Sequence, residues 1–412
     1  MTYIGERRGG GAGRCYVLLL LLGVFLAVAC RDDLNAPVDC PALCPGGQPP
    51  VLESVLIARD SMDSSFVGYV PAGLGISLRV SNGLPVSEDR GIVQFLPLPD
   101  TVVVSDSGHH YVIDSVEFGL TLQARDTLVD SLRFLLYRLP IGIDTTTTFA
   151  DIAPNLVPGN VVDTIFVPDS VKSGVIQSVL SGAELTRVLI PPGDSGKIAI
   201  AIALVGSAPT GARIASIAAT GSPRMKTYVT ADSVADSTKK QVSISRFPSF
   251  ASFVSQAPLA LNNDLLSIGG APSHRARLKF DLPRNLRDSV TILRATLELT
   301  PNSTILGLPN DPATLQAIGV IGDLGAKSPL VTGGNTIGLK TVDAGTTGTV
   351  EIDVTRLIRA WQTKNGLPTI VFIAIAPEAA TFTQPVFKST RSGSGAPQLR
   401  ITYYDKFPFQ RF

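Results

Sequence analysis

Two stretches of this chain carry the same short motifs in the same order, and this repetition constrains the fold more than any local pattern does. The stretches span residues 51–232 and 240–405. Six pairs of motifs correspond: Ser65-Phe66-Val67 with Ser252-Phe253-Val254, Phe95-Leu96-Pro97 with Phe280-Asp281-Leu282-Pro283, Val116–Leu122 with Ala295–Leu299, Leu132–Tyr137 with Leu315–Val320, Leu185–Ile190 with Val354–Arg359, and Ser216–Lys226 with Ser389–Arg400. Because each repeat must build the same strands and turns, the sequence predicts two related modules.

The local pattern within both stretches predicts β-structure. Short runs such as Gly91–Phe95 and Val116–Leu122 alternate apolar and polar residues, and the turns between them draw on an excess of glycine (38) and proline (30). Strands of this size and spacing are typical of sandwiches. Lys197–Leu204 and Pro368–Ala376 are more continuously apolar, which predicts strands buried on both faces. We therefore expect an all-β fold of two tandem antiparallel β-sandwich modules, jelly-roll-like, with little helix.

The composition shifts give the expected boundaries. We place the first module at residues 51–232, a linker at 233–244, the second module at 245–405 and a tail at 406–412. Residues 141–170 include four consecutive threonines, Thr145–Thr148, and several prolines. Such a composition favours a long surface loop or insertion, to which the sequence assigns no role.

One short helix is expected in the second module. Asp353 is a suitable N-cap. Val354, Leu357, Ile358 and Trp361 follow at a spacing that places them on one face of a two-turn helix. This face would close one end of a sandwich, with Trp361 as its largest apolar contact. A sugar-stacking role for Trp361 is the alternative, but its place on the apolar stripe favours core packing.

The N-terminus predicts export and a lipid anchor. Polar residues with three arginines precede an apolar run, Tyr16–Ala29, that is short for a membrane span and ends in small residues. The run stops at Cys30, in a sequence that resembles the lipobox of bacterial lipoproteins. The resemblance implies a signal peptide at residues 1–29, lipidation of Cys30 and attachment to the cell envelope through acyl burial in a membrane. An ordinary cleaved signal with an incidental Cys30 is the alternative.

Residues 30–50 are rich in proline, glycine and aspartate and are expected to form a flexible tether. Cys40 and Cys44 lie close together within it. In an exported protein they could close a small disulfide loop. A metal site is less favoured, because two thiolates without a nearby histidine fall short of four ligands.

Charge excludes nucleic-acid binding. The chain has 35 Lys and Arg against 34 Asp and Glu. Removal of residues 1–29, with three arginines and Glu6, leaves 32 against 33 and a net charge near −1. A near-neutral chain without basic clusters lacks the electrostatic signature of nucleic-acid binding. Several aspartates stand beside serine or threonine, and we interpret them as solvated strand faces and turns rather than as metal ligands: Asp60, Asp106, Asp114, Asp126 and Asp130.

No catalytic motif is present, and we expect neither catalysis nor a cofactor. His109 and His110 stand between Gly108 and Tyr111, in an expected exposed turn, and the third histidine is His274. The sequence contains no HExxH, no GxSxG and no phosphate-binding glycine loop. A glycosidase needs only two carboxylates at a suitable separation. Asp281 and Asp353 are candidates, although each has a local role as a strand end or a helix cap.

The second repeat resembles the DNRLRE family of disaggregatase-related modules. The matching residues are Arg277–Leu282, Ala295–Leu299, Val354-Thr355, Trp361, Asn365–Leu367, Phe387–Ser389 and Pro397–Tyr403. The similarity covers most of 245–405 and extends more weakly over 51–232. The D-N-R-L-R-E string itself is absent, and Ser389–Ser392 stand near its place. Because the matching positions are structural, they identify no ligand-binding residue.

Some members of this family are classed as carbohydrate-binding, so the resemblance implies non-catalytic binding of a polysaccharide or cell-surface glycan. The expected protein is therefore a lipid-anchored component of the bacterial cell envelope, at the outer membrane or cell surface. A structural or protein-binding lipoprotein is the alternative, and a polysaccharide-degrading enzyme is the least favoured reading.

Overall fold

The computed structural model describes residues 51–406, with gaps at 60–62, 68–71, 84–87, 189–195, 233, 235–239, 257–261, 263, 332, 334–336 and 364–365. The expected signal peptide, Cys30, the tether, Cys40 and Cys44 all lie outside the described residues. Within them, no helix combines the length and apolar character that crossing a bilayer requires. The described residues from Val51 onward belong to one compact unit.

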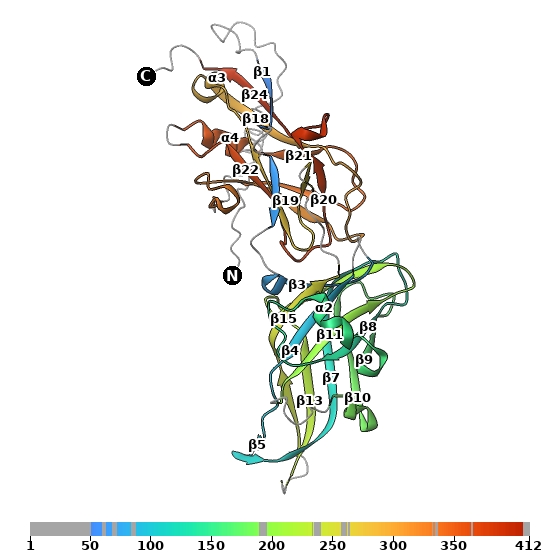
Figure 1. The fold of residues 1–412 in the computed structure, drawn as a ribbon. Coiled ribbons are helices and arrows are strands. Elements are labelled where there is room, and N and C mark those ends of the chain that lie inside the picture. Colours follow the sequence, from blue (N-terminus) through green and yellow to red (C-terminus); the bar gives the residue numbers. More distant parts are fainter. Residues whose placement is uncertain are drawn as a thin grey trace, which may run out of the picture. The chain divides into compact units, whose positions relative to one another are not determined.

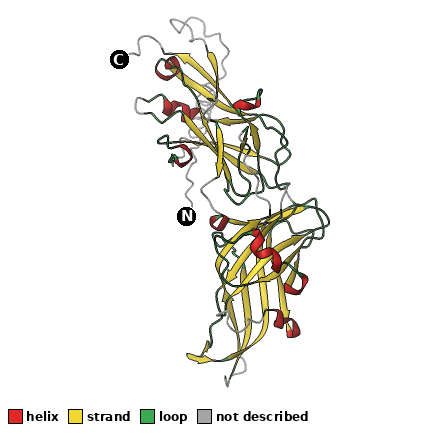
Figure 2. Cartoon of the chain, viewed as in Figure 1, coloured by secondary structure: helices red, strands yellow, loops and turns green. Residues whose placement is uncertain are grey.

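The all-β expectation is confirmed, because strands dominate the described chain and helices are few and short (Figure 2). One set of strands, here called the N-terminal sheet pair, builds two antiparallel sheets. Its strands are β3 (Ser77–Asn82), β4 (Asp89–Phe95), β7 (Tyr111–Arg125), β8 (Arg133–Leu139), β9 (Val161–Phe166), β10 (Gly174–Ser181), β11 (Ile198–Val205), β12 (Thr210–Ala215), β13 (Arg224–Ala231), β14 (Gln241–Arg246) and β15 (Pro248–Ser255). The sheet orders are β14-β13-β7-β12-β3, with β10 also on β7, and β15-β4-β11-β8-β9. A small hairpin joins β5 (Val102–Val104) to β6 (Ser107–His109).

The remaining strands build the C-terminal sheet pair. They are β1 (Leu52–Ile57), β2 (Ser64–Val67), β16 (Leu265–Ser267), β17 (His274–Lys279), β18 (Val290–Leu299), β19 (Ala313–Gly319), β20 (Ile337–Val342), β21 (Val350–Asp353), β22 (Ile370–Ala376), β23 (Val386–Lys388) and β24 (Gln398–Asp405). Their orders are β1-β24-β18-β21, β2-β17-β22-β19-β20 and β16-β23. In Figure 1 the blue strand β1 lies beside the red strand β24, from the other end of the chain.

Each sheet pair encloses its own apolar core, as a sandwich requires. In the N-terminal pair, Phe118 on β7 faces Phe95 on β4, with ring centroids 6.5 Å apart. In the C-terminal pair, Leu297 on β18 and Ile373 on β22 belong to the same buried cluster. Alternation supplies the apolar face of most strands. The continuously apolar strands β11 and β22 are buried on both faces, as expected.

The two sheet pairs share one strand order. The sheet β2-β17-β22-β19-β20 corresponds to β15-β4-β11-β8-β9, the run β1-β24-β18-β21 to β14-β13-β7-β10, and the pair β16-β23 to β3-β12. Five of the six motif pairs lie on corresponding strands or directly follow them: β2 with β15, β4 with β17, β7 with β18, β8 with β19, and β12–β13 with β23–β24. In the remaining pair, a short helical turn follows β10 as a helix follows β21.

The strand pairing nevertheless divides the chain differently from the expected boundaries. Strands β1 and β2, placed in the first module, pair with β24 and β17. Residues 241–246, placed in the linker, form β14 and pair with β13, while β15, placed in the second module, pairs with β4. The period-two pattern specifies which face of a strand is buried, but it does not specify the neighbouring strand.

The expectation of a surface loop at 141–170 was wrong in its second half and incomplete in its first. Residues 161–166 are strand β9. The segment before it contains α2 (Phe149–Ile152), η3 (Ala153–Asn155) and η4 (Pro158–Asn160). Ile152 is buried against Ile92 and Ala201, on the face of the sheet that points away from the main core. This insertion therefore covers the outer face of the five-stranded sheet.

The predicted helix after β21 is confirmed as α4 (Thr355–Trp361). Leu357, Ile358 and Trp361 are its buried residues and belong to the C-terminal core. The side chain of Trp361 is only 2% exposed. Core packing, rather than stacking on a sugar in solvent, is therefore the role that the structure supports for Trp361.

Candidate ligand-binding groove

The two carboxylates nominated from the sequence have local partners. Asp281 is exposed and lies 3.8 Å from the Arg59 guanidinium. Asp353 accepts a hydrogen bond from the backbone N–H of Thr355 at 2.9 Å. The prediction of Asp353 as the N-cap of α4 was wrong by one residue, because the N-cap is Val354 and Asp353 precedes it. Burial raises the Asp353 pKa, but the hydrogen bonds from Thr355 and nearby arginines outweigh it and leave this pKa below its ordinary value.

The histidines occupy different environments. His109 ends β6, and its Nδ1 lies 3.0 Å from the backbone oxygen of Asp232. His110 is exposed, as expected. His274 is the first residue of β17 and is only 1% exposed. Burial lowers the pKa of its imidazole, and its Nδ1 has no hydrogen-bond partner among the described residues.

The aspartates beside serine and threonine hold local hydrogen bonds and turns, but Asp126 is buried, so the expected solvated position was wrong for it. Asp106 lies in a turn with a positive φ of 65°, Asp114 accepts a hydrogen bond from Thr230, and Asp126 accepts one from the N–H of Leu128. Asp60 lies outside the described residues. Among the residues that are described, no three His, Cys, Asp or Glu side chains gather as a metal site would require.

A groove of about 420 Å³ opens at one end of the five-stranded N-terminal sheet. Its volume lies in the range of small-molecule sites. Its lining comes from the start of β8, the end of β9 and the end of β11: Ser131, Leu132, Arg133, Phe166, Val167, Pro168, Asp169, Val205, Gly206 and Ser207. The segment between β8 and β9, residues 140–160, covers another part of this sheet face, where it packs near Leu139 and Ala199.

The strand register explains which side chains reach the groove. Val205, Arg133 and Phe166 stand opposite one another across β11, β8 and β9. Phe134 and Ile165, their neighbours in sequence, point into the core and are fully buried. Since side chains alternate between faces, Arg133 and Phe166 point outward. Phe166 is 69% exposed, which is unusual for a large aromatic residue on a strand.

The loops at the rim are held by backbone contacts. The N–H of Val167 donates to the oxygen of Leu132 at 2.9 Å, and the Asp169 carboxylate accepts a hydrogen bond from the N–H of Ser131 at 2.9 Å. A Cβ on Gly206 would lie 3.0 Å from side chains of Val129, Leu132 and Thr210. Glycine at this position therefore permits the close approach that shapes the groove floor.

The chemistry of the groove suits an uncharged or weakly charged polar ligand with apolar faces. Phe166 offers a ring face, and the rim adds the Arg133 guanidinium and the Asp169 carboxylate. Among the described residues, no ion pair or hydrogen bond engages the Arg133 guanidinium. A sugar ring presents C–H groups on one face and hydroxyls on its edge, which match an aromatic ring beside charged hydrogen-bonding groups.

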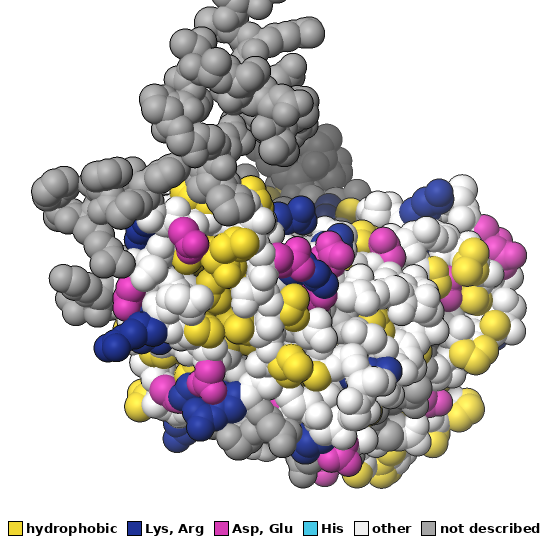
Figure 3. Space-filling model, turned by 90° about the horizontal axis from the view of Figure 1, so that it is seen from above, with side chains coloured by type: hydrophobic (Ala, Val, Ile, Leu, Met, Phe, Trp, Pro, Cys, Tyr) yellow, Lys and Arg dark blue, Asp and Glu magenta, His cyan; other side chains and the backbone are white. Residues whose placement is uncertain are grey.

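Other exposed polar regions are occupied by their own partners. On the outer face of β7 and β13, Glu117 accepts a hydrogen bond from the Tyr228 hydroxyl at 3.1 Å, and the Lys226 ammonium lies 4.7 Å from the Tyr228 ring centroid. On β24, Arg400 pairs with Glu298 and Glu53. Figure 3 shows acidic and basic side chains interspersed on one face, without a patch of one sign.

A wider groove of about 720 Å³ lies beside α4 and β20 and includes Arg294, Asp353 and Leu339. No aromatic residue lines it. The groove with Phe166 is therefore the better candidate for carbohydrate. No family model matches the chain, and no curated protein matches it.

Sequence reasoning missed this groove. Phe166 ends β9, whose sequence V-V-D-T-I-F does not alternate apolar and polar residues and lies inside the stretch expected to be a loop or insertion. No local pattern marks this position, because the groove depends on the pairing of Phe166 with Arg133 on the neighbouring strand.

Proposed function

We propose that this protein is a non-catalytic polysaccharide-binding component of the bacterial cell envelope, held there by a lipid on Cys30. The exposed Phe166 beside Arg133 in an open groove is the observation that carries the binding proposal. The DNRLRE resemblance of the second repeat and the lipobox-like N-terminus support the same assignment. Asp281 and Asp353 both have local structural partners, which favours binding over hydrolysis.

The test is binding of the full-length mature chain to a panel of neutral and acidic polysaccharides, by affinity electrophoresis and calorimetry. Phe166→Ala should weaken binding about tenfold, since an aromatic contact contributes roughly 0.5–1.5 kcal/mol beyond area burial. Phe247→Ala is the matched control, because Phe247 is similarly exposed, at 57%, but lies outside the groove. Retention of no polysaccharide, together with capture of a specific protein partner, would instead establish the structural or protein-binding alternative.

The anchor has a separate test. Cells that express the full chain are labelled with palmitate, and Cys30→Ser should abolish the label. Label that persists in the Cys30→Ser variant, or is absent from the unaltered chain, would reject the lipoprotein assignment while leaving polysaccharide binding to its own experiment.

A further inference from the structure

The first two strands of each repeat lie in sheets built by the other repeat. Strand β1 pairs with β24 over six residue pairs, and β2 pairs with β17 over four. In return, β14 pairs with β13 and β15 with β4. All four strands occupy corresponding edges, because β1 and β14 end one type of sheet and β2 and β15 end the other.

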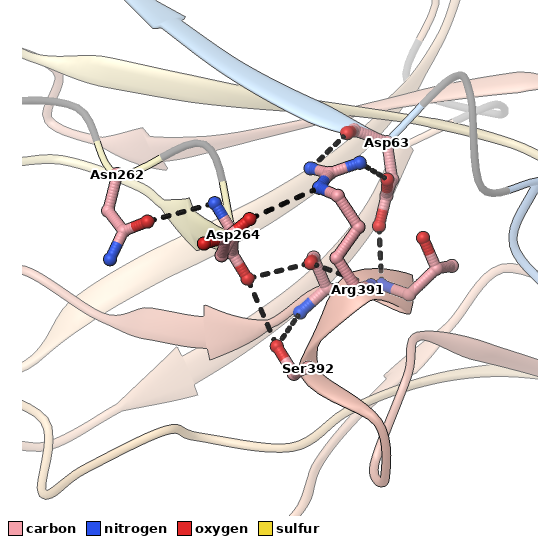
Figure 4. A network of polar contacts seen from close by, with 7 residues as sticks. Asp63, Asn262, Asp264, Arg391 and Ser392 are labelled. Atoms are coloured by element: carbon pink, nitrogen blue, oxygen red, sulfur yellow. Dashed lines mark hydrogen bonds and ion pairs between the residues drawn. The ribbon is translucent and has the colours of Figure 1, made fainter.

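The segment that carries β1 and β2 is held by more than backbone pairing. Between the strands, the Asp63 side chain is fully buried. Its carboxylate accepts hydrogen bonds from the Arg391 guanidinium and the Thr390 N–H, both at 2.7 Å (Figure 4). Arg391 also donates to the Asp63 backbone oxygen at 2.9 Å. A buried carboxylate with several charge-assisted hydrogen bonds fixes the position of the segment strongly.

Apolar and polar contacts also hold the segment that carries β1 and β2. Ala58 is buried in the C-terminal core, and the rings of Phe66 and Phe372 meet edge to face at 5.3 Å. The N–H of Ser267 donates to the Ser65 hydroxyl at 2.8 Å. Without residues 51–67, the edges of β24 and β17 would have unpaired backbone groups and an opened core.

The segment that carries β14 and β15 is held in the first repeat by equally specific contacts. Arg246 at the end of β14 donates to the backbone oxygens of Leu96 and Gly196 at 2.6 and 2.8 Å. On β15, Ala251 and Phe253 are buried, and Ser255 donates to the Asp89 carboxylate. Residues 241–255 therefore complete the sheets of the first repeat as residues 51–67 complete those of the second.

We infer that the two repeats, residues 51–232 and 240–405, are binding partners of each other through these exchanged strands. The covalent connection between them is then not what holds them together. If the chain is cut within 233–240, each half keeps two strands inserted in the other half, and the halves stay associated.

The experiment introduces a specific protease site between residues 235 and 239 of the full chain. After complete cleavage, gel filtration should show one species that contains both halves and has the thermal midpoint of the uncut protein. Two separate folded species after cleavage would overturn the inference, because two repeats that each kept their own first strands would part. Arg391→Ala should speed dissociation of the cut halves on dilution.

An engineered disulfide between β1 and β24 tests the strand exchange even if the cut chain aggregates. Leu56 and Leu399 are opposite one another in β1 and β24, at a separation compatible with a disulfide. In a chain whose four native cysteines are replaced by serine, Leu56→Cys with Leu399→Cys should crosslink within one chain. The halves of the cut protein then stay joined in denaturant until reductant is added.

The matched control is Leu56→Cys with Met225→Cys. Met225 holds the place of Leu399 in the first repeat, since Pro223-Arg224-Met225 matches Pro397-Gln398-Leu399. It would face Leu56 if each repeat kept its own first strands. No crosslink is expected in this control, and its formation in place of the Leu56–Leu399 link would overturn the inference.

Discussion

The two sheet pairs share a strand order but carry different side chains at the same end of their five-stranded sheets. In the N-terminal pair, the last cross-strand row is Val205, Arg133 and Phe166. The corresponding row in the C-terminal pair is Ala376, Thr314 and Thr341. Only the first row carries an aromatic ring and a guanidinium. The two sheet pairs share a strand order but differ in this surface, so the candidate binding chemistry belongs to the N-terminal pair alone.

The cores diverge as well. In the C-terminal pair, α4 follows β21 and buries Trp361. In the N-terminal pair, the short helical turn η5 (Gly182–Arg187) follows β10, and Leu185 is only partly buried against the core. A large buried aromatic residue therefore closes the end of the C-terminal sheet pair, whereas the partly buried Leu185 lies at the corresponding end of the N-terminal pair.

The first residues of β4 and β17 show a third difference. Asp89 begins β4 and forms a buried ion pair with Arg79, with an N–O distance of 2.7 Å. His274 begins β17 and is buried with no ion pair among the described residues. One repeat thus neutralises a buried charge with a partner, whereas the other uses a group that can be neutral by itself.

The largest expected difference concerns independent folding. Residues 72–255 contain every strand of the N-terminal sheet pair, whereas residues 262–405 lack β1 and β2. The first fragment should melt cooperatively, and the second should not, because two of its sheet edges are unfilled. Circular dichroism during heating measures both. Adding residues 51–67 after residue 405 through a short turn should restore the melt, since Leu52 and Tyr403 are cross-strand neighbours. A cooperative melt of 262–405 alone would remove this distinction.

Trp361→Ala should cost the full chain about 3–5 kcal/mol of unfolding free energy, as large-to-small changes at buried aromatic positions do. Leu185→Ala at the corresponding turn should cost only about 1 kcal/mol, typical of a partly buried site. Urea unfolding of both variants gives the comparison. Equal losses would mean that the two ends are closed equally well.

The His274 pKa predicts a pH dependence that resides in one repeat. Because burial lowers this pKa in the folded state, the unfolded chain binds a proton below about pH 6.5 that the folded chain excludes. Stability should therefore be highest above that pH and fall as the solution becomes more acidic. In His274→Asn this part of the slope should disappear, as measured by urea unfolding between pH 7 and pH 5.

The smallest expected effect is that of Phe166→Ala on stability. The ring is 69% exposed, so its removal should change the unfolding free energy by no more than about 0.5 kcal/mol. A larger loss would show that Phe166 supports the sheet, and a binding defect could then not be assigned to the groove. Thermal melts of the purified variant decide this before any ligand is used.

The sequence predicted where strands form better than it predicted which strands pair. Val116–Leu122 and Leu132–Tyr137 were located because alternation is local information, and α4 was located because its apolar spacing is helical. Val116–Leu122 proved to be part of a longer strand, β7 (Tyr111–Arg125). The pairing of β1 with β24 depends on residues that are distant in sequence, and no periodicity encodes it. The groove escaped detection for the same reason, since Phe166 acquires its meaning from Arg133 on the neighbouring strand.

The pairing of β1 with β24 also determines how long β1 stays unpaired while the chain is synthesised. Glu53 on β1 and Arg400 on β24, which form an ion pair, are 347 positions apart in the chain. At translation rates of roughly 5–20 residues per second, β1 waits about 20 to 70 seconds before its partner β24 exists. Val55 and Ile57 have apolar side chains that stay exposed even in the finished protein, at 43% and 60%. The first strand to be made thus pairs with the last, and a nascent chain must keep β1 from pairing elsewhere until then.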